Sequence, residues 1–191
     1  MNTLVEGAGH FIWPLGFCSF LAAFIAIERL IALRPGNIMP EAVTALLARG
    51  DLSSPLPRRD GDTLGGRLVH FCKKNNPDTE TFKAYAQMEL SQLERGLFLL
   101  DTIVSVAPLI GLLGTVYGLF MLFPEKGLPN TATLTHGIGL ALTTTILGLL
   151  VAIPALICSN YIARRLEVIS ARVNLAVERL LALLPPAPPP P

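Results

Sequence analysis

The run TIVSVAPLIGLLGTVYGLFMLFP, residues 102–124, contains no charged side chain and lies between Asp101 and Glu125. A helix of about 20 apolar residues is long enough to cross the hydrocarbon core of a bilayer. This run therefore predicts a membrane-spanning helix. Its glycines, its proline and its threonine distinguish it from a plain lipid anchor, and they guide the interpretation of the rest of the chain.

Two other runs lack charged side chains, residues 11–27 and residues 127–163. The first is short for a span unless its helix also includes Glu28 and Arg29. The second is too long for a single crossing, so we expect residues 127–130 to form a loop before the helix. The sequence thus predicts three spans.

The composition agrees with a membrane protein. Hydrophobic residues make up 51% of the 191 residues, charged residues make up 15%, and the mean hydropathy is +0.54. Soluble domains carry about 25% charged residues. Residues 1–10 contain no Lys or Arg, so we expect no cleavable signal peptide and a first span that stays as an anchor. The three cysteines, Cys18, Cys72 and Cys158, have neither disulfide-framework nor zinc-site spacing.

The distribution of Lys and Arg predicts the orientation of the chain. These residues are concentrated in segment 34–98 and after residue 163, whereas the N-terminus has none and the loop after the second span has only Lys126. The positive-inside rule then places segment 34–98 and the C-terminus in the cytoplasm, with the N-terminus outside. The expected fold class is an all-α membrane protein with three transmembrane helices and long helical cytoplasmic extensions.

The expected organisation has seven segments. They are an N-terminal periplasmic end with the first span (1–33), a cytoplasmic helical segment (34–98), the second span (99–124), a short periplasmic loop (125–132), the third span (133–163), a cytoplasmic helical extension (164–184) and a Pro-rich tail (185–191).

The cytoplasmic parts are expected to be mostly helical. Pro40–Arg49 has a proline near its start and a glycine just past its end, as helix termini prefer. A second helix is predicted over Thr63–Lys74, and a helical apolar stripe begins near Asp78 and should continue into the second span. Ser53–Gly61 is rich in Pro, Ser and charge and predicts a loop. A stripe after Arg164 needs a partner face, which favours bundling with copies of the chain.

Small residues recur at helical spacing in the second and third spans. Such stripes let helix backbones approach closely in lipid, which predicts helix–helix packing. The residues we expect at this contact are Gly111, Gly114, Gly118, Gly148 and Ala152.

Hydroxyl groups accompany both stripes. Thr115 lies on the small face of the second span, and Thr144 and Thr145 belong to a run of three threonines in the third. One interpretation is that each hydroxyl bonds only to its own helix backbone. The other is that the threonines line a polar, water-accessible path for an ion. Hydroxyls alone cannot store a proton, because their pKa is far too high.

Prolines and ionisable groups mark further candidate positions. Pro108 and Pro154 lie inside spans, where each predicts either a simple kink or a hydrated point on an ion path. Ionisable residues within spans are functional candidates by default. Here they lie near the span ends: His136 towards the outside and, at the cytoplasmic boundary, Glu28, Arg29 and Asp101.

Two stretches resemble the MotA/TolQ/ExbB proton channel family, and the ExbB/TolQ branch most closely. Residues 107–118, APLIGLLGTVYG, are similar to the second-span signature of that branch. Residues 137–155, with Asn160 after them, resemble its third span, and Ile27-Glu28-Arg29-Leu30 also fits. The resemblance covers nearly the whole chain except the tail.

The resemblance implies a homopentameric ring around a dimer of a single-span partner of the ExbD/TolR kind, in the bacterial inner membrane. In that family the partner's membrane aspartate carries the proton, and a TonB-like protein can receive the output. Thr115 and Thr145 match the family's pore-facing threonines. No cofactor is expected, and protons are the expected transported ion.

One position departs from the family pattern. Leu140 stands where the ExbB/TolQ branch carries a glutamate. The alternatives are therefore a structural membrane scaffold without ion transport, or a flagellar or gliding type of stator that uses another ion. An enzyme is not expected, because the sequence shows no paired carboxylates, metal-ligand cluster or nucleophile–base set. The scattered basic residues suggest no nucleic-acid partner.

Overall fold

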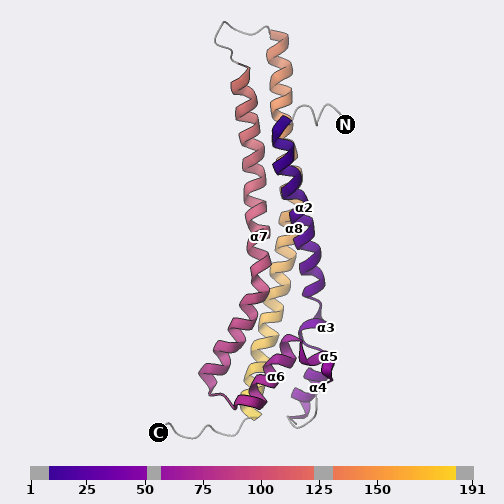
Figure 1. Cartoon of the computed structure of the whole chain (residues 1–191), viewed down its shortest axis with the longest axis vertical. Helices are drawn as coiled ribbons and strands as arrows, with labels where there is room; N and C mark the ends of the chain where they lie inside the picture. The colour runs from indigo at the N-terminus through magenta and orange to yellow at the C-terminus, as the bar shows by residue number, and fades with distance from the viewer. Residues whose placement is uncertain (1–8, 51–56, 123–130, 184–191) are drawn as a thin grey trace. The chain divides into compact units, whose positions relative to one another are not determined.

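The computed structural model describes residues 9–50, 57–122 and 131–183, and every element in these ranges is helical. In chain order the elements are η1 (Gly9–Phe11), α2 (Ile12–Ala32), α3 (Pro35–Ile38), α4 (Glu41–Arg49), α5 (Arg58–Gly61), α6 (Leu64–Asn75), α7 (Thr79–Met121) and α8 (Thr131–Leu183) (Figure 1). The loop expected at 125–132 and the tail at 185–191 lie largely or wholly outside the described residues.

Three of these helices are long and apolar enough to cross a membrane: α2, α7 and α8. The expectation of an all-helical protein with three candidate spans is confirmed. The α2 helix includes the Glu28–Arg29 turn, as the short first run required. The helices expected over Pro40–Arg49, over Thr63–Lys74 and from Asp78 onward correspond to α4, α6 and the start of α7. The exact membrane boundaries stay predictions.

One local expectation was wrong. Ser53–Gly61 was expected to be a loop throughout, but its last four residues form the short helix α5. The turn is closed by hydrogen bonds from the N–H groups of Asp60 and Gly61 to the carbonyl of Pro57. Pro57 has no backbone N–H, so its position before the first turn leaves no donor without a partner. Residues 51–56 lie outside the described part of the chain.

The chain divides into two compact units. The first contains residues 1–28 and 96–161, and the second contains residues 29–95 and 162–191. Each long helix therefore contributes one part to each unit. The candidate spans supply most of the first unit, and the segments expected in the cytoplasm supply the second.

The first unit is built on an antiparallel pair formed by α7 and α8, with α2 beside them (Figure 1). Its core contains Leu15 of α2, Ala107 of α7 and Ala152 of α8. Phe11 also lies against Tyr117, with ring centroids 5.7 Å apart. Small side chains at the centre of the pair allow the close helix contact that the stripe of small residues predicts.

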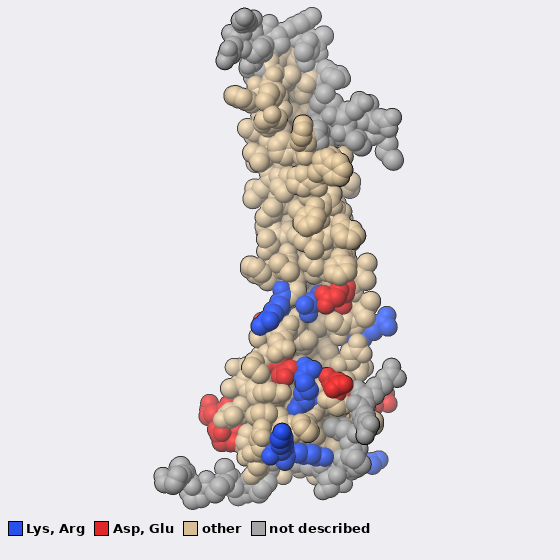
Figure 2. Space-filling view, in the orientation of Figure 1, with Lys and Arg blue, Asp and Glu red and all other residues tan. Residues whose placement is uncertain are grey.

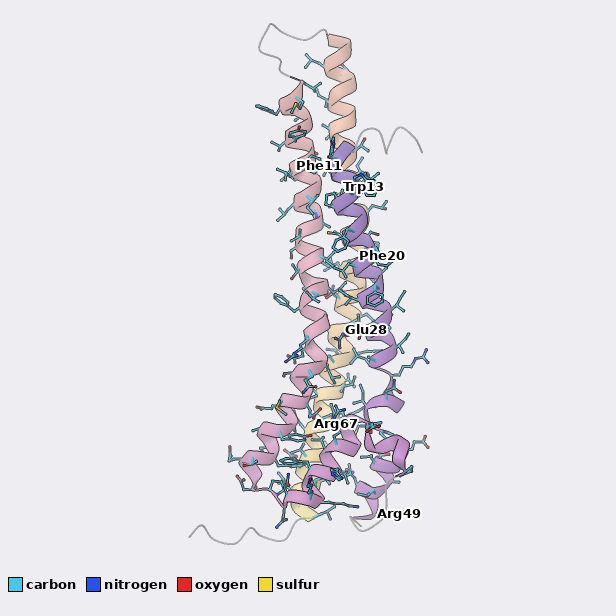
Figure 3. The ribbon with its side chains drawn as sticks, in the orientation of Figure 1. Phe11, Trp13, Phe20, Glu28, Arg49 and Arg67 are labelled. Carbon is cyan, nitrogen blue, oxygen red and sulfur yellow. The ribbon has the colours of Figure 1, made fainter. Side chains whose placement is uncertain are left out.

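The outer surface of the first unit is strongly apolar. Trp13 and Phe20 of α2, labelled in Figure 3, are 81% and 71% exposed. Figure 2 shows this unit in tan over most of its visible face, whereas blue and red atoms gather on the helices of the second unit. Exposed apolar area of this extent is far larger than soluble monomers carry, so a bilayer or other chains must cover it.

The second unit has its own core and well-formed helix ends. Phe82, Leu68 and Val173 are among its fully buried side chains. Thr63 caps α6 by accepting the N–H of Gly66 at 3.2 Å. Gly50 ends α4 in the left-handed region, with φ of 67°, a conformation that glycine adopts without strain.

One ion pair in the second unit joins α6 to α7. Arg67 Nη2 lies 2.6 Å from Glu89 Oε2, and Arg67 Nε donates to the same oxygen at 3.0 Å. The Glu89 side chain is only 7% exposed. The pair therefore compensates a carboxylate that burial alone would destabilise.

Candidate functional site: a hydroxyl cluster between two spans

Three threonine hydroxyls meet between α7 and α8. Thr115 Oγ1 lies 2.5 Å from Thr145 Oγ1 and 3.3 Å from Thr144 Oγ1. All three hydroxyls also lie within 3.2 Å of the carbonyl oxygen of Gly111. The structure therefore brings together the three threonines that the sequence selected as ion-path candidates.

Close backbone packing makes this cluster possible. A Cβ on Gly114 would lie 2.8 Å from Thr144 Cβ, and a Cβ on Gly111 would lie 2.8 Å from the Thr144 carbonyl oxygen. A Cβ on Gly118 would lie 3.1 Å from Ala141 Cβ. The glycines of α7 thus leave the space into which Thr144 fits. The small-residue stripe and the hydroxyl cluster are two parts of one arrangement.

The three hydroxyls differ in burial. Thr144 is 2% exposed and is an interior residue of the helix pair. Thr115 and Thr145 are partly exposed. The neighbouring Thr143 bonds the carbonyl of Gly139 on its own helix at 3.1 Å. Thr143 therefore bonds its own helix, whereas Thr115, Thr144 and Thr145 also bond across the pair. That these threonines line an ion path stays a prediction.

The donors and acceptors of the cluster do not match one to one. Each hydroxyl donates one hydrogen bond and can accept two. Besides Gly111, the carbonyl of Ala141 lies 3.0 Å from Thr115 Oγ1 and 2.7 Å from Thr144 Oγ1. The three hydroxyl hydrogens can therefore bond to these two carbonyl oxygens, or to one another's hydroxyl oxygens, in more than one pattern. Such a cluster can offer either an oxygen or a hydrogen to a nearby group.

The candidates at the cytoplasmic boundary fall in different places. The Asp101 carboxylate accepts a short hydrogen bond from the Ser159 hydroxyl within the first unit. Arg29 Nη1 donates to the carbonyl of Leu93, at 3.3 Å, within the second unit. Glu28 is exposed. The sequence analysis did not identify Ser159 as the partner of Asp101.

Of the remaining candidates, the two prolines lie within the long helices, and the side chains of the others lie outside the described residues. α7 continues through Pro108 and α8 through Pro154, so neither proline ends its helix. Each proline lacks an N–H, which removes one backbone hydrogen bond within the helix. The side chains of His136 and Leu140 lie outside the described residues.

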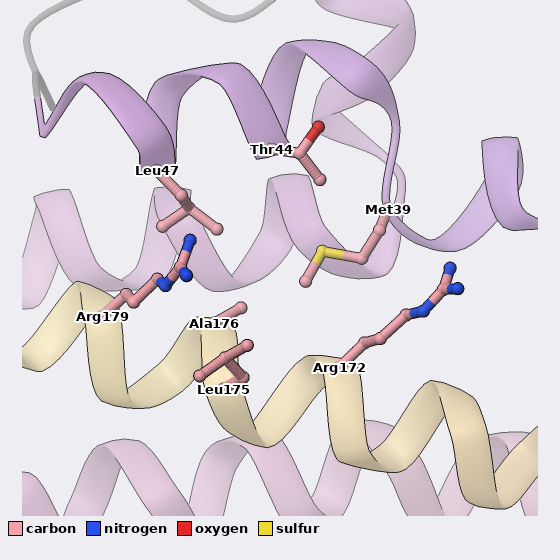
Figure 4. A pocket seen from close by; sticks show the side chains of 7 residues that line it. All are labelled: Met39, Thr44, Leu47, Arg172, Leu175, Ala176 and Arg179. Atoms are coloured by element: carbon pink, nitrogen blue, oxygen red, sulfur yellow. The ribbon is translucent and has the colours of Figure 1, made fainter.

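A separate cavity of about 270 Å³ lies in the second unit, between α4 and the last turns of α8 (Figure 4). Leu47, Met39 and Leu175 contribute apolar surface, and two arginines, Arg172 and Arg179, flank it. Positive charge repels cations. The hydroxyl cluster is therefore the better candidate for passage of a cation.

Three membrane-length helices with hydroxyl groups enclosed between two of them define a class of integral membrane protein with a polar element inside its spans. Comparison with known proteins identifies the family. The model of the MotA/TolQ/ExbB proton channel family matches residues 65–174, and the chain belongs to this family, in its ExbB branch.

Individual relatives agree with this assignment. The biopolymer transport protein ExbB of Aquifex aeolicus is 44% identical over 103 residues, covering 52% of this chain and 69% of the relative. A putative ExbB-like protein 3 of Synechocystis is 34% identical over 161 residues, covering 76% of each protein. The biopolymer transport protein exbB1 of Vibrio cholerae is 30% identical over 179 residues, covering 81% of this chain and 75% of the relative.

Proposed function

We propose that this chain is the channel-forming subunit of an inner-membrane motor driven by the proton-motive force. Copies of the chain form a ring, expected to be a pentamer, around a dimer of a single-span ExbD/TolR-like partner. Proton flow through the ring is converted into mechanical work on the cell envelope, such as TonB-type transport. The N-terminus faces the periplasm and the C-terminus the cytoplasm. Membership of the ExbB branch supports this class of function.

The observation that carries the proposal is the hydrogen-bonded pair of Thr115 and Thr145. Polar groups enclosed between spans are costly in lipid and are usually functional. Within the described parts of the first unit, residues 102–122 and 131–161 contain no carboxylate. An acid that carries a proton past the threonines must therefore come from another chain, as a partner with an aspartate in its span would supply.

The exposed apolar surface supports assembly. The large apolar side chains exposed on α2, α7 and α8 are too many for a soluble monomer. Lipid covers part of this surface, and neighbouring copies cover part of it in the proposed ring. The partly exposed Thr115 and Thr145 then face the central space in which the partner's span sits.

Leu140 supports one other function. A leucine replaces the glutamate of the ExbB/TolQ branch, so a scaffold with the same fold and no ion transport is the second candidate. A stator that uses another ion is a variant of the first proposal. The motor proposal and the scaffold differ in one measurable respect: only the motor requires the threonines for proton flux.

The test is proton flux through the complex reconstituted in liposomes, with an ExbD-like single-span protein as partner. Thr145→Ala and Thr115→Ala should each lower the flux strongly while assembly is retained. Thr143→Ala is the matched control, because Thr143 bonds only Gly139 of its own helix among the described residues. Flux that is unchanged in both test variants, or absent from the wild-type complex, would favour the scaffold.

A further inference from the structure

Two side-chain hydrogen bonds join α7 to α8 in the first unit, and they are separated by the same number of residues on each helix. Thr115 pairs with Thr145, and Asp101 pairs with Ser159. From position 101 to 115 on α7 and from 145 to 159 on α8 there are fourteen residues in each case. At 3.6 residues per turn and 1.5 Å rise, fourteen residues return to within about 40° of the same face and advance about 21 Å. Asp101 and Thr115 therefore lie on one face of α7.

Asp101 differs from its surroundings in this part of the molecule because its side chain is charged. In the α7 and α8 portions of the first unit that the structure describes, it is the one Asp, Glu, Lys or Arg. Its partner Ser159 is 3% exposed, so the hydroxyl that donates to the carboxylate is fixed inside the helix pair. The rest of Asp101 is exposed. One carboxylate oxygen is thus held by the protein, while the residue as a whole stays accessible.

Polar groups also lie on α7 between the Thr115–Thr145 pair and the Asp101–Ser159 pair. Ser105, one turn from Asp101 on the same face, donates its hydroxyl to the Asp101 carbonyl at 3.0 Å and is exposed. Its oxygen keeps lone pairs that can accept from water. Pro108, a further turn along, has no N–H, so the carbonyl of Val104 loses its helical donor. The Ser105 hydroxyl and the Val104 carbonyl therefore offer oxygens that can accept from water between Pro108 and Asp101.

We propose that Asp101, oriented by Ser159, is the proton-accepting site at the cytoplasmic end of the path that begins at the threonine cluster. This inference rests on the proposed function. A proton that the partner's acid has carried past Thr115 and Thr145 and released to water binds to the Asp101 carboxylate, forming an O–H bond. The carboxylic acid then releases the proton to water on the cytoplasmic side, which restores the carboxylate without any other change of charge.

A carboxylate is suited to this role in a way that the threonines are not. A carboxylate oxygen can accept a proton and return it to water, whereas a threonine hydroxyl can only relay one. A metal cation is a poorer fit, because hard cations need about six oxygen ligands and this site presents one carboxylate and one hydroxyl. No metal-binding group of three His, Cys, Asp or Glu occurs among the described residues.

The variant Asp101→Asn tests the proposal in the complete complex in liposomes. The amide oxygen of asparagine still accepts the Ser159 hydroxyl, so the helix pair is retained while the ionisable group is lost. We expect proton flux to fall by about a hundredfold, the scale contributed by a positioned proton-transfer group. Asp101→Glu should retain part of the flux, and Ser159→Ala should give an intermediate loss. Thr102→Val, with Asp101 intact, is the matched control, because the Thr102 hydroxyl donates to the Phe98 carbonyl of its own helix at 2.8 Å and has no place on the proposed path.

Chemical rescue separates proton transfer from a structural role. Added formate, a small diffusible acid, should restore flux in Asp101→Ala but leave Thr145→Ala unchanged. Flux in Asp101→Asn equal to wild type, with the threonine dependence intact, would overturn this inference alone. Absence of threonine dependence would instead overturn the proposed function. Loss of sodium flux and not of proton flux in Asp101→Asn would overturn the assignment of a proton to this site.

Discussion

Gly111 and Gly148 face each other across the α7–α8 pair at backbone contact. A Cβ on Gly148 would lie 2.7 Å from the carbonyl oxygen of Ala107 and 3.1 Å from Gly111 Cα. Neither contact can be relieved by rotation of a side chain, because both involve backbone atoms. The hydroxyl cluster lies within a turn of this contact, so its geometry depends on the absence of side chains here.

Gly148→Ala is therefore expected to destabilise the first unit. Overpacking at a close contact costs about 1–3 kcal/mol, and here the helices must separate to accept the methyl group. The measurement is the thermal unfolding midpoint of the full chain in detergent, followed by circular dichroism. Gly139→Ala is the control, since a Cβ there meets nothing within 4 Å. A midpoint for Gly148→Ala at or above that of wild type would contradict the packing described.

Thr144→Val should have a smaller effect. The substitution keeps the shape of a side chain that is 2% exposed and removes only its hydroxyl. The carbonyls of Gly111 and Ala141 still have Thr115 within reach, and Gly111 has Thr145 as well. The expected cost is about 1 kcal/mol, the net value of one hydrogen bond. Chemical unfolding of the detergent-solubilised chain measures it, with Thr144→Ser as the variant that retains the donor.

Arg67→Met should destabilise the second unit because it leaves the Glu89 carboxylate buried without its guanidinium. The cost is expected to be about 1–3 kcal/mol, below the value for a fully buried pair since Arg67 is 42% exposed and partly screened by water. The double variant Arg67→Met/Glu89→Leu should recover much of the loss. A double variant that is as unstable as the single one would show that the ion pair is not the cause.

Asp78 is expected to make the stability of the protein depend on pH in the acidic range, through its contacts at the start of α7. Hydrogen bonds from the Thr81 hydroxyl and from the Thr81 N–H lower the pKa of the Asp78 carboxyl below 3.8. A carboxyl whose pKa is lowered on folding contributes stability above its unfolded pKa and loses it as the pH falls through the folded value. Asp78→Asn should remove this part of the pH dependence below about pH 4. Unfolding midpoints of both proteins across that range test it.

The fold was largely predictable because its main elements leave strong one-dimensional signals. Uncharged runs gave the three candidate spans, and a glycine and a proline marked the ends of α4. The short helix α5 was missed because local hydrogen bonds to Pro57 outweigh the loop preference of its composition. A four-residue turn produces no periodic pattern that could indicate it.

The candidate site was predictable in its members but not in its contacts. Thr115, Thr144 and Thr145 were selected from their small-residue surroundings, whereas their shared acceptor, Gly111, is visible only when α7 and α8 are paired. The Asp101–Ser159 pair was missed for the same reason, because serine in a small-residue stripe signals close packing. The equal spacing of the two pairs, fourteen residues on each helix, is the signal that was available in the sequence.

The shared acceptors of the threonine cluster have a consequence for ions of either sign. With three hydroxyl hydrogens and two carbonyl oxygens, rotation about the Cβ–Oγ bonds alone can turn an oxygen or a hydrogen outward while every heavy atom stays in place. In the proposed motor, a cation on the path meets lone pairs, and a partner carboxylate that has just given up its proton meets O–H groups. The two partly exposed hydroxyls, Thr115 and Thr145, can thus solvate both the protonated and the ionised form of that carboxylate, without any movement of the helices that hold them.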